Sequence, residues 1–354
     1  MGPLKTHLKN GFFTSSPEPF FFPDIGTFFN QDESIAFELI DRLHDAGCKF
    51  LKGEILHSED ICLPKDICGT ESYYNPETGK MVTENYRELI ERKVISFKTY
   101  ERIFEHSKKL GMKLVLSVYD HEGISFANAM DCRVLKIASS NINHQHLIHL
   151  VAQTGIPMVI DTGKASLEDI SRAVQWAKDG GAEDLLIQHS PPAPPKPHSA
   201  QNLNFMKTLG EFYGLPFGLS DHSNCNRMLL AAVAIGARVL EKGICQDSPN
   251  PDQDVAHALP IGRVRESLES LNIIHQAMGK GVYDHSSPPA KHPSRMGLVL
   301  RSGVRAGDEI NDTNIGFAFP ALSIDAQEWP NIKGKTYRSD LKKGTVLEWG
   351  HVKF

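Results

Sequence analysis

The sequence predicts a closed (β/α)8 barrel of the TIM type, followed by a small β-rich domain. Short apolar runs, each followed by a helix-like segment, recur eight times within about 260 residues, a length typical of this barrel. No G-x-G-x-x-G motif follows a predicted strand and no P-loop is present, so an open nucleotide-binding sheet is not favoured. From Gly297 onward, short β-like runs alternate with glycine turns, as in small β domains.

Eight apolar runs are predicted as strands because each is short, rich in aliphatic or aromatic residues and bounded by polar or glycine-containing segments. Most of them end abruptly in charged or hydroxyl side chains. In a barrel of parallel strands, these ends open into the functional site. The predicted strands cover residues 20–26, 49–54, 113–118, 133–138, 157–163, 184–189, 216–219 and 238–243.

The segments between the strands show helical spacing of apolar residues and recognisable ends. Gly47, Gly111 and Gly155 end three of them, and Ser166 with Asp169 forms a near capping box at the start of another. The predicted helices cover residues 34–46, 97–110, 123–130, 146–154, a segment that begins at 166, and residues 202–212, 226–237 and 262–278.

Domain boundaries follow from this pattern. Residues 1–18 are predicted to be an N-terminal tail, and the barrel domain spans residues 19–281. The proline-containing segment 282–294 is predicted to be a linker, and residues 295–354 form the β-rich domain.

Two segments of the barrel domain do not fit the strand–helix repeat. Residues 56–96 exceed an ordinary connection and are expected to be a functional loop over the site. The stretch 191–197 is so rich in proline that it excludes a helix or a central strand. We expect a stiff loop there, at the same end of the barrel as the site.

The composition excludes some classes of protein. With 354 residues, a net charge of −5 and no run of lysine or arginine, the chain is not expected to bind nucleic acid. No apolar stretch approaches the roughly 20 residues of a membrane span, and residues 1–6 lack the apolar core of a signal peptide. Six cysteines without a C-x-x-C pair indicate reduced thiols and a cytoplasmic location.

Polar side chains at the predicted strand ends supply a candidate site. Lys52 and Lys136 stand inside otherwise apolar runs, and a buried ammonium group needs an anionic partner. An organic phosphate or carboxylate would be such a partner, with serine hydroxyls completing the cradle. Structural ion pairs to Glu54, Glu241 or Asp24 are the alternative. The candidate substrate-binding residues are Lys52, Glu54, Ser117, Lys136, Ser139, Asp161 and Ser220.

A histidine and two carboxylates suggest a metal. His222 follows the seventh predicted strand in the run Gly-Leu-Ser-Asp-His-Ser and is a candidate metal ligand or proton carrier. It needs further ligands, and Glu241 and Asp254 are available. Imidazole with hard carboxylates suits Mn²⁺ or Mg²⁺. A Schiff base on one of the two lysines, as in class I aldolases, is a further alternative. The candidate catalytic carboxylates are Asp24, Glu241 and Asp254.

Separated motifs resemble those of the sialic acid (N-acetylneuraminate) synthase family, including its divergent spore-coat-polysaccharide-type members. The run Lys136-Ile137-Ala138-Ser139 is similar to the family's KIAS segment. Residues 218–222 resemble its G-[YL]-SDH motif, and residues 240–242 its E-[KR]-H strand. Residues 295–354 resemble the SAF (antifreeze-like) domain of that family. The similarity covers about residues 18–354, in the same order.

The resemblance implies a TIM barrel that condenses phosphoenolpyruvate with an amino sugar or related aldose, giving an α-keto sugar acid and phosphate. It implies a divalent metal, usually Mn²⁺, held by two histidines, one of which matches His222; this metal activates the sugar aldehyde. It also implies a domain-swapped homodimer. The positions that match the phosphoenolpyruvate-binding residues are Lys52, Ser117, Lys136, Ser139 and Ser220.

The chain departs from the family pattern mainly where the sugar and the metal are expected. The second metal histidine falls at Gly243, so one of two metal ligands is missing. The phosphoenolpyruvate half of the site is better preserved than the sugar half. The other departures are Asp24 for glutamate and Phe29 for histidine near the first strand, Glu54 for glutamine, Asn141 for an acidic residue, Asp161 for serine, prolines at 191–195, and no arginine near 319–321.

These observations predict a divergent synthase of surface-glycan biosynthesis whose acceptor sugar is not specified by the sequence. The alternative is a catalytically altered or inactive paralogue that binds an anionic metabolite or carbohydrate and scaffolds glycan biosynthesis. Gly243 and the altered first strand favour the alternative. The two lysines, Ser139, Ser220 and His222 favour the synthase.

Overall fold

The computed structural model describes residues 11–75, 78–193, 196–249, 254–279, 281 and 294–354. The chain divides into two compact units, Met1–Gly279 and Lys280–Phe354, and each is described by itself. Most of the expected linker, residues 282–293, lies outside the described residues, as do residues 1–10 of the expected tail.

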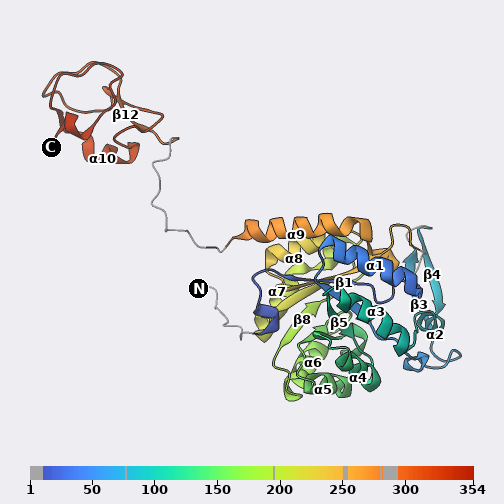
Figure 1. The fold of residues 1–354 in the computed structure, drawn as a ribbon. Coiled ribbons are helices and arrows are strands. Elements are labelled where there is room, and N and C mark those ends of the chain that lie inside the picture. The colour runs from blue at the N-terminus through green and yellow to red at the C-terminus, as the bar shows by residue number, and fades with distance from the viewer. Residues whose placement is uncertain (1–10, 76–77, 194–195, 250–253, 280, 282–293) are drawn as a thin grey trace. The chain divides into compact units, whose positions relative to one another are not determined.

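The first unit is a closed barrel of eight parallel strands, which confirms the predicted fold class (Figure 1). The eighth strand of the barrel pairs in parallel with the first, so that the ring has no open edge. A two-residue strand, β11 (Leu259–Pro260), adds to β10. The barrel strands are β1 (Phe20–Asp24), β2 (Phe50–Glu54), β5 (Lys113–Ser117), β6 (Val134–Ile137), β7 (Met158–Asp161), β8 (Leu185–His189), β9 (Phe217–Asp221) and β10 (Val239–Cys245).

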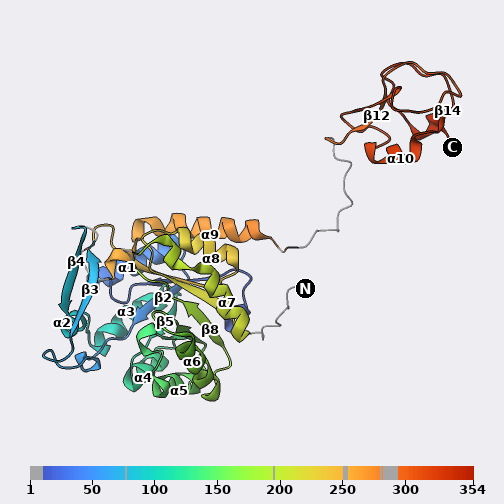
Figure 2. The same cartoon turned by 180° about the vertical axis from the view of Figure 1, so that it is seen from behind.

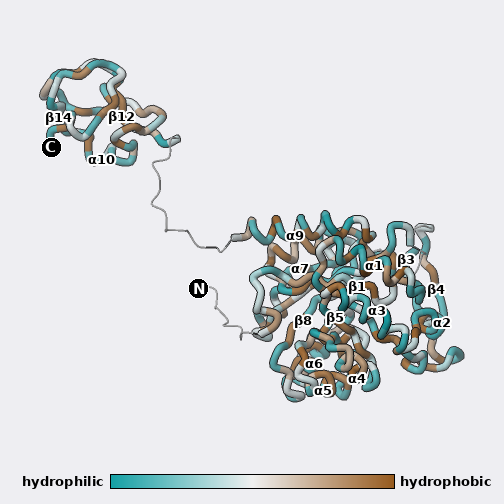
Figure 3. Tube along the Cα trace, in the orientation of Figure 1, coloured by the Kyte–Doolittle hydropathy of each residue, from teal (hydrophilic) through white to brown (hydrophobic). Residues whose placement is uncertain are grey.

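Helices surround the barrel, as both ribbon views show (Figures 1 and 2). Their apolar faces bury aliphatic side chains against the outward-facing residues of the strands. Along α9 the tube alternates between teal and brown, as expected of a helix with one face in the core (Figure 3). The helices are α1 (Glu33–Ala46), α3 (Phe97–Lys109), α4 (His121–Ala129), α5 (Gln145–Gln153), α6 (Leu167–Asp179), α7 (Leu203–Tyr213), α8 (Arg227–Ile235) and α9 (Val264–Met278).

Local sequence explains where several helices begin and end. Asp32, Ser96 and Asp120 each accept a backbone N–H bond at a helix N-terminus. Ser166 and Asp169 form the expected capping box at the start of α6. Gly47 ends α1 in the left-handed conformation that glycine adopts without strain, with a φ of 98°.

The N-terminal half of the barrel interior is filled by apolar side chains. Phe13, which lies in a short 3-10 helix (Phe12–Thr14), is fully buried in this cluster. Phe13 of the expected tail is therefore part of the barrel core, and Phe12 packs against the same cluster. The strand residues of the cluster are Phe22, Phe50, Val115, Val134, Val159, Leu186 and Val239.

The long segment after β2 contains secondary structure of its own. It forms an antiparallel hairpin of β3 (Thr70–Asn75) and β4 (Lys80–Asn85), followed by α2 (Tyr86–Glu91). In Figures 1 and 2 the hairpin stands at one side of the barrel. The sequence pattern had indicated only a loop, because these strands are polar and pair only with each other.

The second unit has a small core of its own. Strand β12 (Gly297–Leu300) pairs with β13 (Ile315–Ala318), and β14 (Thr336–Tyr337) pairs with β15 (Val352–Lys353). Ten buried apolar side chains, among them Leu298 and Tyr337, pack around these strands and the short helix α10 (Trp329–Ile332). In the described part of both units, no helix is both long and apolar enough to cross a membrane. The six cysteines are free.

Candidate functional site

A ring of polar side chains follows the apolar layer inside the barrel. Side chains of a strand alternate between its two faces, so residues two positions apart both face the interior. On every strand of this barrel, an inward-facing apolar residue or glycine is followed two positions later by a polar residue. The eight polar residues form four pairs of register partners, in which the two Cα atoms face each other across neighbouring strands. These pairs are Asp24 with Lys52, Ser117 with Lys136, Asp161 with Gln188, and Ser220 with Glu241.

Lys52 is fully buried and is held by two carboxylates. Its Nζ lies 2.5 Å from Oδ2 of Asp24 and 2.8 Å from Oε1 of Glu54. Burial disfavours the charged lysine, but the charges of Asp24 and Glu54 outweigh it and hold the pKa of Lys52 well above its usual value. Burial also raises the pKa of Asp24 to about 7, against the opposing charge of Lys52. Asp24 therefore exchanges its proton near neutral pH.

Lys136 is the centre of a second buried cluster. Its Nζ lies 2.5 Å from Oε1 of Glu241 and 2.8 Å from Oδ2 of Asp161. Glu241 also accepts hydrogen bonds from Ser220 Oγ at 3.1 Å and from Gln188 Nε2 at 3.3 Å. Burial works against ionisation of Glu241, but the charges of Lys136 and Lys52 lower its pKa to about 2. Glu241 is therefore a permanent carboxylate.

The two lysines thus face four carboxylates in the ring and at its rim. The contacts match the ion pairs that the sequence offered as the structural alternative, with Asp161 as an additional partner. Some buried polar atoms of the ring nevertheless have no hydrogen-bond partner. They are Ser117 Oγ, Asp161 Oδ1 and Gln188 Oε1. Unpaired atoms of this kind are costly in a folded protein and indicate where a bound ligand would find partners.

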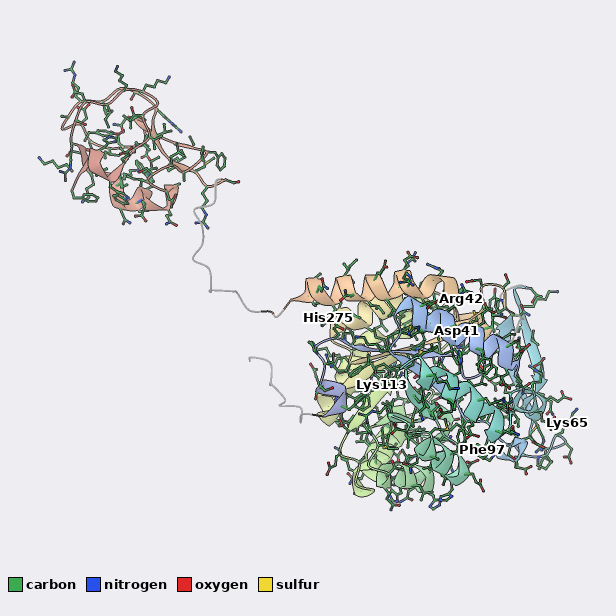
Figure 4. All side chains as sticks on the ribbon, viewed as in Figure 1. Asp41, Arg42, Lys65, Phe97, Lys113 and His275 are labelled. Atoms are coloured by element: carbon green, nitrogen blue, oxygen red, sulfur yellow. The ribbon has the colours of Figure 1, made fainter. Side chains whose placement is uncertain are left out.

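A cavity of about 980 Å³ opens beside the ring, and we refer to it as the site cavity. Tyr119 and Glu54 are among its lining residues, and Tyr119 donates a hydrogen bond to Glu54 at 3.1 Å. On one wall His57 lies 2.8 Å from Asp120, and its ring stacks on Phe97, which Figure 4 labels. Segments 56–62 and 86–93 supply much of its lining, so part of the long segment after β2 does border the cavity.

A second cavity, of about 800 Å³, lies at the N-terminal ends of β1, β2 and β5. Lys113 and His275, both labelled in Figure 4, are among its lining residues. This cavity thus lies at the end of the strands opposite to the polar ring. The site cavity, by contrast, is lined by Glu54, whose carboxylate pairs with Lys52 of the ring. The site cavity is therefore the one that can serve the chemistry of the ring.

Asp254 lies in the site cavity and accepts two strong hydrogen bonds. Its Oδ2 is 2.6 Å from Thr27 Oγ1 and 2.5 Å from Lys93 Nζ. Burial opposes its ionisation, but the charge of Lys93 and the hydrogen bonds from Lys93 and Thr27 hold the pKa of Asp254 well below its usual value. Its carboxylate is thus ionised and anchored to the loop after β1.

Two histidines lie together at the rim of the ring. The ring centroids of His222 and His257 are 4.7 Å apart in an edge-to-face arrangement. His222 Nδ1 lies 3.3 Å from Ser190 Oγ, whereas Nδ1 of the buried His257 has no partner. Burial lowers the pKa of His222, and burial together with the charge of His222 lowers that of His257 to about 3. Both imidazoles are neutral, as a metal ligand requires.

The absence of a side chain at Gly243 does not leave a cavity. A Cβ atom built on Gly243 would lie 2.4 Å from Cζ of Phe28. Phe28 occupies this space, and its ring contacts His257 edge to face at 6.5 Å between centroids. Ser139 lies in a short 3-10 helix after β6, next to Gly163 and close to Ser190.

The structure brings most of the predicted residues together, and it adds others. Gln188 faces the ring, whereas His189, named by the sequence as the end of its strand, turns away and bonds the carbonyl of Gln201. Because side chains alternate along a strand, counting two positions from the inward-facing Leu186 would have predicted that Gln188 also faces inward. His257 gave no signal in the sequence, because it comes close to His222 only through the fold. The same is true of the pair His57 and Asp120.

Comparison with known proteins agrees with this architecture. A model of the NeuB family matches residues 39–283. The N,N'-diacetyllegionaminic acid synthase of Campylobacter jejuni is 24% identical over 330 residues, covering 92% of this chain and 97% of the relative. The N-acetylneuraminate-9-phosphate synthase of Mus musculus is 25% identical over 283 residues, covering 78% of this chain and 76% of the relative.

A solved structure shows the same fold. The N-acetylneuraminic acid (sialic acid) synthetase of Leptospira borgpetersenii superposes with a TM-score of 0.65 at 21% sequence identity. The match covers 77% of this chain and 89% of that chain. At this identity the likeness supports the barrel fold and leaves the chemistry to be argued from the site itself.

Proposed function

Because the chain belongs to the NeuB family, we propose that it condenses phosphoenolpyruvate with an aldose or amino sugar, giving an α-keto sugar acid and phosphate for surface-glycan biosynthesis. Two of its relatives are named N,N'-diacetyllegionaminic acid synthase and N-acetylneuraminate-9-phosphate synthase. The observation that carries the proposal is the pair of buried lysines, Lys52 and Lys136, at the end of the barrel that opens to the site cavity.

In this proposal the two lysines hold the phosphate and carboxylate of phosphoenolpyruvate. Each lysine exchanges one of its carboxylate partners for the substrate anion, while the hydroxyl of Ser117, unpaired in the protein, donates to it. Glu241 remains ionised and keeps Lys136 in place. These contacts would orient C3 of phosphoenolpyruvate toward the acceptor aldehyde.

The reaction forms a bond between C3 of phosphoenolpyruvate and the aldehyde carbon, and the aldehyde oxygen takes up a proton. Water adds at C2 and loses a proton. The C2 hydroxyl then loses its own proton to the departing phosphate as the bond from C2 to the bridging oxygen breaks, which gives the keto group. Asp24, with a pKa of about 7, is suited to transfer one of these protons. A divalent cation bound at His222 would polarise the aldehyde as a Lewis acid.

One observation favours a second function. The two lysines already face four carboxylates, Asp24, Glu54, Asp161 and Glu241, so the ring is not prepared for an anion without rearrangement. A paralogue that only binds a metabolite or carbohydrate and scaffolds other proteins would tolerate this. A Schiff-base aldolase is disfavoured, because its lysine needs a lowered pKa and both lysines have a raised one.

The test is release of inorganic phosphate from phosphoenolpyruvate with Mn²⁺, measured against a panel of N-acetylated hexosamines and plain aldoses. We expect release with one acceptor class and its loss in Lys136→Ala. Lys113→Ala, an exposed lysine at the opposite end of the barrel, is the matched control and should leave the rate unchanged. Binding of phosphoenolpyruvate without release from any acceptor would favour the scaffold instead.

The proposal extends to assembly. In the family resemblance, the second unit is a SAF domain that closes the barrel of a partner chain in a homodimer. We propose the same for residues 295–354, whose independent core supports a separately folded domain. Sedimentation equilibrium of the full chain and of a chain ending at residue 279 would test it, with a dimer expected only for the full chain.

A further inference from the structure

We propose that His222 and His257 together form the protein part of a divalent-cation site, in which His257 replaces the ligand missing at Gly243. The inference deepens the proposed function, since it names the residues that would hold the cation beside the acceptor aldehyde. It concerns a residue of this chain that sequence comparison with the resembling family does not indicate.

The first argument is the geometry of the two imidazoles. Their ring centroids are 4.7 Å apart, and they come from different parts of the barrel, one after β9 and one from the short helix Val255–His257 after β10. His257 is only 7% exposed, and its Nδ1 has no hydrogen-bond partner. A buried, unpaired imidazole nitrogen is costly unless a ligand completes it.

The second argument is a chain of contacts that links the missing ligand to the new one. Phe28 fills the space in which a side chain at position 243 would begin, and its ring rests against the edge of His257. His257 in turn faces His222. The loss of a side chain at 243 and the presence of His257 are therefore parts of one packing arrangement.

The third argument is that the carboxylates suggested by the sequence are already engaged. Both oxygens of Glu241 accept hydrogen bonds from the ring, and Oδ2 of Asp254 is held by Thr27 and Lys93. Two imidazoles leave the remaining positions of a cation to water and substrate. Open positions are what a catalytic metal needs and a structural one lacks.

In the described part of the chain, one group brings three metal-type ligands close together, and it is separate from the histidine pair. It consists of His57, Asp120 and Glu122 at the wall of the site cavity. Asp120, however, uses Oδ1 to cap α4 and Oδ2 to bond His57. His57 and Asp120 thus satisfy each other without a cation, whereas Nδ1 of His257 has no partner, and we therefore place the cation at the histidine pair.

The experiment is a titration of the metal-free full chain with Mn²⁺ alone, followed by electron paramagnetic resonance. We expect wild-type protein to bind Mn²⁺ and to show nitrogen modulation from two imidazoles in spin-echo spectra. His257→Gln should weaken binding by more than about tenfold, since even loss of an outer-shell partner commonly costs that much. His57→Gln, at the competing group, should bind as the wild type does.

A rescue separates ligation from simple damage to the fold. In the His257→Gln background, Gly243→His alone should not restore binding, because its Cβ meets Phe28. Adding Phe28→Ala should restore it. Circular dichroism and thermal melts check that each variant is folded, and the spin-echo spectrum of the wild-type protein tests the proposal without any variant.

Three results would overturn the inference: no Mn²⁺ binding by the wild type, binding unchanged in His257→Gln, or binding lost in His57→Gln alone. Because no substrate is present, these outcomes do not depend on phosphate release. A cation bound at the pair without any condensation would leave this inference standing and contradict the proposed function.

Discussion

The barrel interior has two layers built from the same strands, and they have opposite chemistry. Val134 and Lys136 lie two residues apart on β6 and both face inward, yet the first belongs to an apolar cluster and the second to an ionic one. The same step separates Leu186 from Gln188 on β8. The strand geometry that places one side chain in the core places the next inward one in the site.

The two layers also obey different energetic rules. An apolar layer is stable by burial alone, at roughly 25 cal/mol per Å² removed from water. A buried charge is tolerated only when its partners are present, and removing one partner costs about 3–5 kcal/mol. The site layer is therefore held by pairing, and a substrate must replace those pairs.

The largest effect is expected from Lys136→Met. It leaves Asp161 and Glu241 buried without their cation and should lower the free energy of unfolding by about 3–5 kcal/mol. Adding Glu241→Gln should recover part of this loss, because one uncompensated charge is removed. Urea denaturation of both variants measures it. Equal stability of the single and double variants would mean that pairing does not hold this layer.

A change in the apolar layer should also lower stability but should leave the rate of the folded protein unchanged. Leu186→Ala removes a fully buried side chain and should cost about 2–5 kcal/mol of stability. The protein that remains folded should release phosphate at the wild-type rate, since Leu186 belongs to the apolar layer and not to the polar ring. Comparing the rate per folded molecule with that of Gln188→Leu sharpens the contrast, because the latter should lose activity with less change in stability.

A smaller effect is expected with pH. Because the pKa of Asp24 is raised to about 7 in the fold, the folded state keeps a proton that the unfolded chain has lost. Its contribution to stability is complete below pH 4 and is lost as the pH rises to 7, by at most about 1.4 kcal/mol per pH unit. Asp24→Asn should flatten this slope in urea titrations at pH 5, 6 and 7. If the pH dependence of the free energy of unfolding were unchanged in Asp24→Asn, a group other than Asp24 would be responsible for it.

The smallest change in stability is expected for Ser117→Ala. Its hydroxyl is buried without a partner, so removing it should leave the free energy of unfolding within about 0.5 kcal/mol or raise it slightly. Affinity for phosphoenolpyruvate, measured by calorimetry, should fall because a donor to the anion is lost. A clear loss of stability with unchanged affinity would show that this hydroxyl serves the fold alone.

Much of the site was predictable from sequence because it depends on the strands themselves. An apolar run that ends in a lysine or a carboxylate indicates both a barrel strand and its functional end, as for Lys52, Lys136 and Glu241. Gln188 was not predicted, because the end of its strand was noted without counting the alternation of side chains from Leu186. The face to which a side chain points depends only on its position along the strand, so counting residues in the sequence predicts it.

The sequence by itself determined the barrel, the family resemblance and the identity of most ring residues. Only the tertiary structure decided that the lysines are already paired with Asp24, Glu54, Asp161 and Glu241. It also decided that Phe28 fills the space beside Gly243 and that His257 meets His222. These contacts join residues up to more than 200 positions apart, and no local pattern in the chain encodes a distance across a closed barrel.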